Sequence, residues 1–434
     1  MENEKQSSSF LKGLVVGLFA ALLISVLAFV TVKVYINYVN HKAQTQVSAG
    51  EDTSESRDPS ASVVTQNVTS KMELIEQVID TYYYQEDIDR EELENGIYRG
   101  MVESLGDPYS AYYSAEELKE MTESIQGIFY GIGATLSLDE DTGFGIIKEV
   151  MSGTPAEEAG LKDGDLIYKV DGESTYDMDL QEIVSRVRGE ENTQVVLTIV
   201  RTGVDDYLEI PITRKKIEDN TVNATMYDHK IGYIQITEFD EVTTNQFKEN
   251  LEMLQGDGME ALILDLRSNP GGSLSAVVDI AGMILPKGLV VYTEDKNGKR
   301  EEYYSDGKHE LTIPMAVLVN GASASASEIL SGAIKDYGIG TLMGTKTFGK
   351  GIVQRPITLS DGSAVKLTVS SYYTPKGNNI HGIGIEPDVE CIFDANAYYD
   401  NRYDNQLEKA REYLSDKLGV EYVAPDNKPV AEEE

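Results

Sequence analysis

The feature of this 434-residue sequence that most constrains its fold is a set of short, mainly apolar runs in its second half. Residues 232–236, 261–266 and 315–319 each read as a buried strand, and helical patterns near residues 245–254 and 273–284 lie between them. Short buried strands that alternate with helices are typical of an α/β fold. We therefore expect an α/β region after Arg214.

The first motif in this region spans residues 264–272 and reads Leu-Asp-Leu-Arg-Ser-Asn-Pro-Gly-Gly. A strand leads into a glycine loop and then into a helix N-terminus, where free N–H groups favour negative charge. The backbone N–H of Gly271 or Gly272 could therefore form an oxyanion hole. Taken alone the signal is weak, because Pro-Gly-Gly is a common turn.

The second motif, residues 317–329, is a strand followed by a loop of small residues that runs into a helix. A serine at a helix start is usually only a cap. Here Ser323, Ser325 and Ser327 alternate, which exceeds what capping needs, and their small neighbours leave room for a substrate backbone. This pattern favours a nucleophilic serine.

The third motif, residues 345–354, places Lys350 between glycines in an otherwise apolar setting. A lysine can act as a base when desolvation lowers its pKa, so that the neutral amine is populated. Lys346 is a competing choice in the same loop, and spacing alone does not separate the two.

Composition excludes several other chemistries. The four histidines, His41, His229, His309 and His381, show no metal-binding spacing, so a hydrolase here needs another base. The single cysteine, Cys391, excludes an internal disulfide and a Cys-rich zinc site. The net charge of −37 argues against nucleic acid as a partner. We expect no metal and no cofactor.

The N-terminus predicts a membrane anchor. Residues 13–32 carry no charge and, at about 1.5 Å per residue, span about 30 Å as a helix. The run is long for a signal peptide and lacks a small-residue cleavage site, so we expect a signal anchor after a cytoplasmic tail at residues 1–12. Residues 33–70 are polar and predict a disordered linker.

Folding is expected to begin near Lys71, with a small helical unit at residues 71–125 that either supports the following domain or forms a dimer interface. The chain after residue 396 predicts a helix at residues 405–418 and a disordered acidic tail.

At residues 126–215 the sequence pattern changes and predicts short strands and two short helices. This region resembles a circularly permuted bacterial PDZ domain. The matching segments include Tyr-Gly-Ile-Gly at 130–133, Ser-Gly-Thr-Pro-Ala at 152–156 and Gly-Asp-Leu-Ile at 164–167. Glycines let successive N–H groups converge on a carboxylate, and an adjacent strand edge could pair with an extended peptide. The predicted peptide-carboxylate site is therefore Tyr130, Gly131, Ile132 and Gly133. A plain tight turn is the alternative.

Together and in this order, the motifs resemble the carboxyl-terminal processing proteases, Ser-Lys peptidases of family S41 that combine a PDZ domain with an α/β core of the ClpP/crotonase type. The resemblance covers residues 71–395, with the core at 216–395, and includes Asp-Pro-Tyr-Ser at 107–110 and Gly-Ile-Gly-Ile-Glu-Pro-Asp at 382–388.

The resemblance implies specific roles. Ser325 would be the nucleophile and Lys350 the base, with Gln354 orienting the lysine. Ala326 would join Gly271 and Gly272 in the oxyanion hole, and Glu328 and Asp336 would be supporting acidic residues. The expected function is cleavage of proteins whose exposed C-terminal tails bind the PDZ domain, with the catalytic part outside the cell membrane.

Two alternatives remain. A non-catalytic anchored scaffold would keep the fold and bind peptides, although intact Ser325, Lys350 and Gln354 argue against it. A penicillin-binding type of acyl enzyme would need Ser-x-x-Lys, but Glu328 stands at that distance. The PDZ domain could also gate activity through Arg188, whose simpler interpretation is a solvated charge at a helix end.

Overall fold

The computed structural model describes residues 62–85, 87–425 and 427. The predicted anchor at 13–32, the tail at 1–12, most of the linker and the acidic end of the chain lie outside these residues. Among the described residues, no helix has the length and apolar character needed to cross a membrane. The chain divides into two compact units, Met1–Ile88 and Asp89–Glu434, each of which is described by itself.

The first unit contains helix α2, Gln66–Tyr82. Thr65 precedes it with extended backbone angles, and its side chain accepts a hydrogen bond from the Val68 N–H, which caps the helix. The helix therefore begins ahead of Lys71, so the predicted end of the linker is too late. No described residue of α2 is buried, and its apolar side chains, including Ile75, are exposed within this unit.

The second unit contains a six-stranded sheet in the order β10-β11-β12-β15-β16-β19. Strand β10 is antiparallel to β11, and all other neighbours are parallel. The strands are β10 (Val222–Tyr227), β11 (Ile231–Ile236), β12 (Ala261–Asp265), β15 (Met315–Val319), β16 (Thr341–Gly344) and β19 (Val389–Glu390). The α/β core predicted from the apolar runs is thus confirmed.

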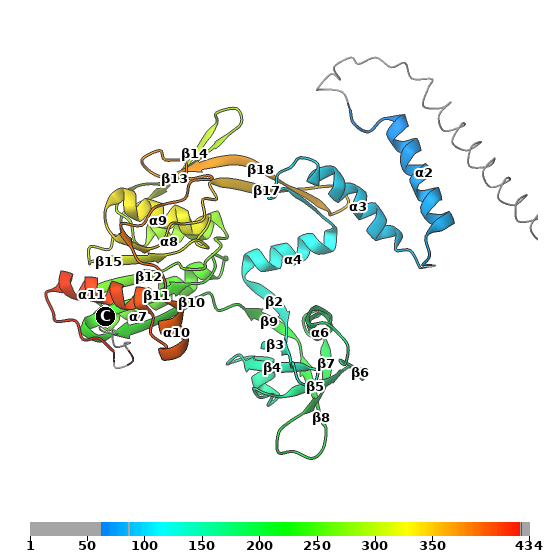
Figure 1. The fold of residues 1–434 in the computed structure, drawn as a ribbon, viewed down its shortest axis with the longest axis horizontal. Helices are drawn as coiled ribbons and strands as arrows, with labels where there is room; N and C mark the ends of the chain where they lie inside the picture. Colours follow the sequence, from blue (N-terminus) through cyan, green and yellow to red (C-terminus); the bar gives the residue numbers. More distant parts are fainter. Residues whose placement is uncertain (1–61, 86, 426, 428–434) are drawn as a thin grey trace, which may run out of the picture. The chain divides into compact units, whose positions relative to one another are not determined.

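Both faces of this sheet are covered, because alternate residues of a strand point to opposite sides. On β12, Leu262 and Leu264 join one apolar cluster, whereas Ala261 and Ile263 join another. Helices α7 (Thr243–Gly256), α8 (Leu274–Gly282) and α9 (Ala326–Tyr337) contribute to the first cluster, and α11 (Asn405–Leu418) contributes to the second. Figure 1 shows α8 and α9 on the same side of β12 and β15.

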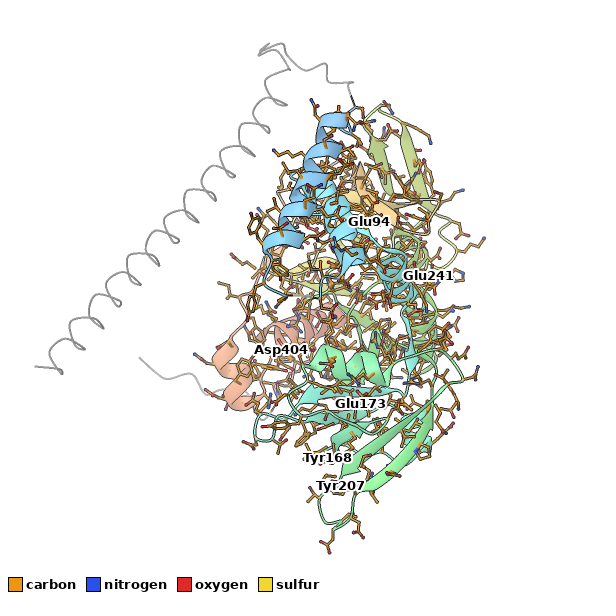
Figure 2. The ribbon with its side chains drawn as sticks, turned by 90° about the vertical axis from the view of Figure 1, so that its right-hand side faces the viewer. Glu94, Tyr168, Glu173, Tyr207, Glu241 and Asp404 are labelled. Carbon is orange, nitrogen blue, oxygen red and sulfur yellow. The ribbon has the colours of Figure 1, made fainter. Side chains whose placement is uncertain are left out.

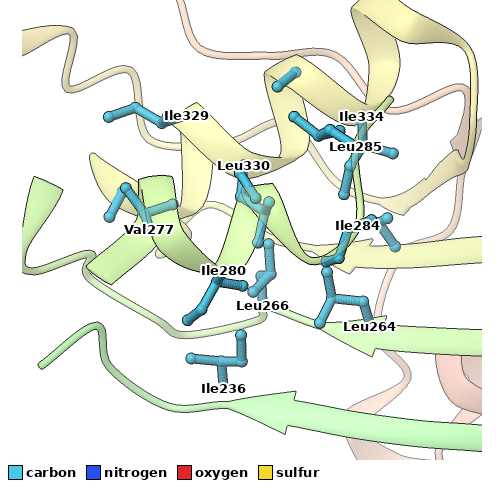
Figure 3. Close-up of a cluster of buried hydrophobic side chains, with 14 of the residues drawn as sticks. Ile236, Leu264, Leu266, Val277, Ile280, Ile284, Leu285, Ile329, Leu330 and Ile334 are labelled. Atoms are coloured by element: carbon cyan, nitrogen blue, oxygen red, sulfur yellow. The ribbon is translucent and has the colours of Figure 1, made fainter. Parts of the chain in front are cut away.

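The larger cluster holds the strand ends in place. Figure 3 shows Val277 and Ile280 of α8 and Leu330 of α9 on the same side of the sheet as Ile236 and Leu264, and all five are buried members of this cluster. Burial of one such side chain stabilises the fold by about 1.5–3 kcal/mol. The carboxyl ends of β12 and β15, from which two of the sequence motifs start, are therefore rigidly supported.

A second, antiparallel sheet was missed by the sequence analysis. Its order is β1-β18-β13-β14, with β17 also paired to β18. The strands are β1 (Ala111–Tyr113), β13 (Gly288–Asp295), β14 (Arg300–Ser305), β17 (Ile352–Thr358) and β18 (Ala364–Tyr373).

Strand β1 corrects the prediction of one helical unit at residues 71–125. It separates helix α3 (Arg90–Glu103) from α4 (Ala115–Gln126), and α2 belongs to the other unit. The predicted start of α4 is confirmed, because Ser114 and Glu117 form a reciprocal capping box.

A further sheet lies in the region expected to form a PDZ domain, in the order β3-β4-β5-β7-β8 with β6 paired to β5. Its elements are β3 (Ala134–Leu138), β4 (Gly145–Val150), α5 (Pro155–Glu158), β5 (Leu166–Val170), β6 (Glu173–Ser174), α6 (Leu180–Val187), β7 (Gln194–Val200) and β8 (Leu208–Thr213). This sheet has its own apolar core. At one end of the sheet the rings of Tyr168 and Tyr207 stack, with their centres 4.8 Å apart. Both residues are labelled in Figure 2.

Short elements complete the second unit. They are β2 (Ile128–Gly131), which pairs with β9 (Lys215–Glu218), the 3-10 helix η1 (Asp228–Lys230) and α10 (Ala395–Asn401).

Candidate active site

The three sequence motifs meet at one edge of the core sheet. They follow β12, β15 and β16, which are adjacent and parallel, so their carboxyl ends lie together. Hydrogen bonds join the loops: the Ser323 hydroxyl donates to the Leu266 carbonyl at 2.8 Å, and the Phe348 N–H donates to the Ser323 carbonyl at 3.1 Å. The fold thus assembles segments that are separate in the sequence.

Ser325 lies at the sharp turn between β15 and α9. Its backbone angles, φ 53° and ψ −112°, are strained for a residue with a Cβ atom. Ser325 also stands at the N-cap of α9, where its N–H donates to the Glu328 carboxylate at 3.0 Å as part of a capping box. The cap interpretation considered for this serine therefore stands beside the nucleophile interpretation, and the strained backbone is what capping does not explain.

Lys350 and Lys346 have different surroundings. The Nζ atom of Lys346 lies 2.9 Å from the Glu386 carboxylate, and its side chain is 47% exposed. Lys350 is half-buried, and its Nζ lies 4.9 Å from the centre of the Tyr109 ring. Burial lowers the pKa of Lys350, and the positive charge of Lys366 lowers it further. These surroundings favour Lys350 over Lys346 as a base.

One cavity of 380 Å³ contains most of the predicted site. Ser325, Lys350, Gln354, Gly272 and Ala326 all line it. The rest of the wall is mainly apolar and comes from α4, α8, α9, β17, β18 and neighbouring loops: Met121, Ile125, Pro270, Ser273, Leu274, Ile329, Ile352, Val353, Pro356, Lys366 and Tyr372.

Gln354 lies in the cavity but does not orient Lys350 in this structure. Its amide nitrogen donates a hydrogen bond to the Thr368 hydroxyl at 3.3 Å. Among the described residues, no hydrogen bond joins it to Lys350. The predicted contact is therefore not formed in this arrangement, because β17 pairs with β18 and places Gln354 opposite Thr368.

The oxyanion-hole prediction is corrected at one residue. The Gly271 N–H donates to the Asn269 side-chain oxygen at 2.8 Å and is already satisfied. Within the part of the chain that the structure describes, the N–H groups of Gly272 and Ala326 donate no hydrogen bond. These two N–H groups, which both border the cavity, are the better donors.

Gly271 is nevertheless needed, for reasons of space. A Cβ atom at residue 271 would lie 2.7 Å from the Ser325 Cβ and 2.9 Å from the Ala326 nitrogen, and the residue has φ +107°. At Gly272, a Cβ atom would lie 2.3 Å from the Phe239 carbonyl oxygen. Gly271 therefore allows the loop to approach the nucleophile turn closely, and Gly272 allows it to approach the backbone of Phe239.

Glu328 connects the nucleophile turn to the lysine loop. It is fully buried, and its carboxylate accepts hydrogen bonds from the N–H groups of Ser325, Gly349 and Lys350 at 2.8–3.0 Å and from the Thr347 hydroxyl at 2.6 Å. A buried carboxylate with four donors is strongly held. Glu328 thus fixes the backbone of Ser325 relative to that of Lys350.

Asp336 does not reach the cavity. It lies near the end of α9, where its carboxylate accepts a hydrogen bond from the Lys376 N–H at 2.8 Å. Its contact holds the turn that follows β18, so any support it gives to the site is indirect.

The sequence analysis assigned no role to Tyr372. It is buried, and its hydroxyl lies within hydrogen-bonding distance of the Ser325 carbonyl, at 3.0 Å, and of the Lys350 carbonyl. Burial raises the pKa of Tyr372, so its hydroxyl remains a donor. Its strand, β18, has no strong local signal in the sequence.

The peptide-carboxylate site predicted at residues 130–133 is divided between the end of β2 and the loop that follows it. Gly133 has φ +80°, and a Cβ atom there would lie 2.3 Å from the Thr154 Cβ. Within the described residues, the N–H groups of Ile132 and Gly133 donate no hydrogen bond, whereas Tyr130 and Gly131 belong to β2, paired with β9. Strand β3, which follows, lies at the edge of its sheet and packs beside α6. These are the parts of a peptide groove.

Arg188, at the end of α6, is exposed, as expected for a solvated charge at a helix end. Its guanidinium lies 5.0 Å from the centre of the Phe129 ring on β2. The relay suggested for it remains a prediction.

Comparison with known proteins agrees with this arrangement. The chain matches Peptidase family S41 over residues 230–391, a PDZ domain over 146–201 and the N-terminal domain of the activating protease CtpB over 25–117.

Similar curated proteins are carboxy-terminal processing proteases. CtpA of Bacillus subtilis is 39% identical over 73% of this chain and 67% of its own length, and CtpB of the same organism is 38% identical over 70% and 64%. The chain thus spans about two thirds of the length of these relatives.

A solved structure of a photosystem II D1 C-terminal processing protease is 32% identical over 73% of this chain and 86% of its own, with a TM-score of 0.44. Because that score is low, the family assignment rests on the sequence matches. The chain belongs to the PDZ-containing carboxy-terminal processing proteases of peptidase family S41.

Proposed function

We propose that this protein is a serine endopeptidase that binds the exposed C-terminal tails of proteins through its PDZ domain and cleaves them with Ser325 and Lys350. The observation that carries the proposal is the shared cavity, which brings together the Ser325 turn, a half-buried lysine and the free N–H groups of Gly272 and Ala326. No metal or cofactor is needed for this chemistry.

The reaction proceeds by acyl transfer. The neutral Lys350 amine accepts the Ser325 hydroxyl proton as Oγ bonds to the scissile carbonyl carbon. The N–H groups of Gly272 and Ala326 stabilise the oxyanion, and the Lys350 ammonium returns its proton to the leaving amine. Water, deprotonated by Lys350, then attacks the ester and releases Ser325.

The cavity also supports a preference in the substrate. Its walls are mainly apolar, with Ile125, Leu274, Ile329 and Val353 among the lining residues. A positively charged side chain would be desolvated there beside Lys350 and Lys366, with no carboxylate among the lining residues. We propose that small or apolar residues flank the scissile bond.

Cleavage of an unfolded protein with an apolar C-terminus tests the proposal. Full-length wild type in detergent should degrade it, whereas Ser325→Ala and Lys350→Ala should lose at least about a hundredfold in rate. Lys346→Ala is the matched control and should retain activity, because that lysine is paired with Glu386 outside the cavity.

The scaffold alternative makes the opposite prediction. If wild type and Ser325→Ala both bind the tail and neither cleaves any substrate, a non-catalytic role is correct.

Two features of the cell biology are also proposals. Residues 13–32 would anchor the protein with its catalytic part outside the cytoplasm, supported by the 20 uncharged residues. Digestion by an added protease checks this. An extracytoplasmic catalytic part is shielded in inside-out membrane vesicles, where it lies in the lumen, and is digested in spheroplasts, where it faces the medium.

Homodimer formation is the second of these proposals. Helix α2 exposes Leu74, Ile75 and Val78 within its unit, and apolar helix faces of this kind are commonly covered by a partner. Ile75→Lys should shift the protein from dimer to monomer in sedimentation, if the wild type is a dimer.

A further inference from the structure

A second lysine shares the cavity with the proposed base. Lys366, on β18, and Lys350 both line it, and both are half-buried. Among the described residues, neither forms an ion pair with a carboxylate. Two ammonium groups in one poorly solvated cavity disfavour each other's protonation, because like charges repel most where water is excluded.

Lys366 is held by a residue from a distant part of the chain. Strand β1 pairs with β18 so that Ala111 lies opposite Lys366. The Lys366 Nζ donates a hydrogen bond to the Tyr113 hydroxyl at 2.7 Å and lies 5.0 Å from the centre of the same ring. The hydroxyl acceptor therefore fixes the position of the Lys366 ammonium in the cavity wall.

The same segment also reaches Lys350, through Tyr109. Its place is fixed by hydrogen bonds: the Thr368 N–H donates to the Ser110 hydroxyl oxygen at 3.1 Å, and the Ser110 hydroxyl donates to Asp107 at 2.6 Å. Residues 107–113 therefore place one tyrosine beside each lysine.

We propose that Lys366, held in place by its hydrogen bond to Tyr113, is a positioning residue whose positive charge favours the neutral, proton-accepting form of Lys350. The inference rests on the proposed function, in which Lys350 is the base. It assigns the segment at residues 107–113 a part in activating the nucleophile and not only in packing.

Other charged and titratable groups around Lys350 do not supply this effect. Glu328 of α9 would favour the ammonium form of Lys350. Its carboxylate, however, already accepts four hydrogen bonds: from the Thr347 hydroxyl and from the backbone N–H groups of Ser325, Gly349 and Lys350. Burial raises the pKa of Tyr372 of β18, so this side chain adds no charge. Asp107 has a lowered pKa, because it accepts the Ser110 hydroxyl and other hydrogen bonds and because His381 is nearby. The lowered pKa of Lys350 has burial as its first cause and Lys366 as its second.

The experiment measures how fast a small fluorophosphonate inactivates the full-length protein as a function of pH. Such a probe reacts with an activated serine without needing the PDZ domain, so tail binding does not enter the result. In wild type the rate should rise with pH as Lys350 loses its proton. In Lys366→Met the midpoint should move up by about one unit, which lowers the rate below the midpoint about tenfold. The plateau at high pH should stay within about twofold of wild type.

Two further variants separate charge from structure. Lys366→Arg keeps the positive charge and should retain the wild-type midpoint. Tyr113→Phe removes the hydroxyl but keeps the ring, and should give a smaller upward shift. Thermal unfolding shows whether Lys366→Met is folded. If it is not, the shift of the midpoint in Tyr113→Phe tests the proposal instead.

An unchanged midpoint in Lys366→Met with a lower plateau would overturn the proposal and leave Lys366 a structural role. An unchanged pH profile in Lys350→Ala would instead show that Lys350 is not the base, which is a failure of the proposed function itself. The two failures are therefore distinguishable.

Discussion

The catalytic edge of the core and the carboxylate loop of the PDZ domain solve a similar problem with different supports. Each presents free backbone N–H groups beside a glycine with positive φ, Gly271 in the core and Gly133 in the PDZ domain. At the catalytic edge the loops are tied together by the buried charge of Glu328, whereas the PDZ loop rests on neutral contacts with Thr154. Chemistry on a developing charge needs a fixed arrangement of donors, and tail capture tolerates adjustment.

The largest effect is expected at the catalytic glycine. Gly271→Ala would push a Cβ atom against Ser325 and displace the oxyanion donors beside it. Loss of one oxyanion donor costs about 10²–10³ in rate, and we expect at least the lower figure. Fluorophosphonate labelling and protein cleavage measure it.

The control for that variant is Gly298→Ala, which has φ +77° and no atom within 4 Å of the added Cβ. It carries the same backbone strain without the clash. If both variants lose activity equally, close approach to Ser325 is not the reason for glycine at 271.

The second effect concerns the buried carboxylate. Glu328→Gln replaces one carboxylate oxygen with an NH₂ group. Because both oxygens of Glu328 accept hydrogen bonds, the NH₂ group would face N–H donors, and the free energy of unfolding should fall by about 3 kcal/mol. Urea unfolding measures this. Glu386→Gln, on an exposed pair, should change it by no more than about 0.5 kcal/mol. A mild result at Glu328 would remove the contrast between the two regions.

A third effect should appear where the chain passes between the two regions. Asp240 is buried beside Gly127, which precedes β2. Burial raises the pKa of Asp240 to about 7, with the charges of Glu238 and Asp219 adding to it. Because the folded pKa lies above the unfolded one, stability is lost as pH rises from about 4 to about 7.

Asp240→Asn should therefore stabilise the protein at pH 8 by about 2 kcal/mol, and by less at pH 5. Thermal unfolding at the two pH values measures the difference. Equal stabilisation at both would mean that the carboxyl group does not titrate in this range.

The smallest effect is expected in the PDZ loop. Gly133→Ala would bring a Cβ atom against Thr154, and affinity for a C-terminal tail peptide should fall about tenfold. Gly153→Ala, with φ +74° and open space, is the matched control. Labelling of Ser325 should be unaffected by both, and a loss of labelling in Gly133→Ala would show that the loop does more than bind tails.

Elements with strong local patterns could be predicted from the sequence. The apolar runs predicted β12 and β15, and helix α11 has the predicted bounds. Strand β1 could not be predicted, because three residues pair with a strand far along the chain and carry no periodic signal. Strand β18 mixes polar and apolar residues, so the second sheet had no clear pattern.

The site was predicted in kind but not in its contacts. The motifs indicated a serine, a lysine and a glycine loop, and the resemblance assigned roles. The choice between Lys346 and Lys350 depends on Glu386, a partner that spacing cannot reveal. The use of the Gly271 N–H by the Asn269 side chain is likewise set by loop geometry.

The most direct test of the central claim, that these loops activate one serine, is to locate a covalent fluorophosphonate adduct by peptide mass mapping. The account predicts a single adduct on Ser325, absent in Ser325→Ala, with none on the buried Ser323 or Ser327. An adduct on another serine, or labelling that persists in Ser325→Ala, would contradict it.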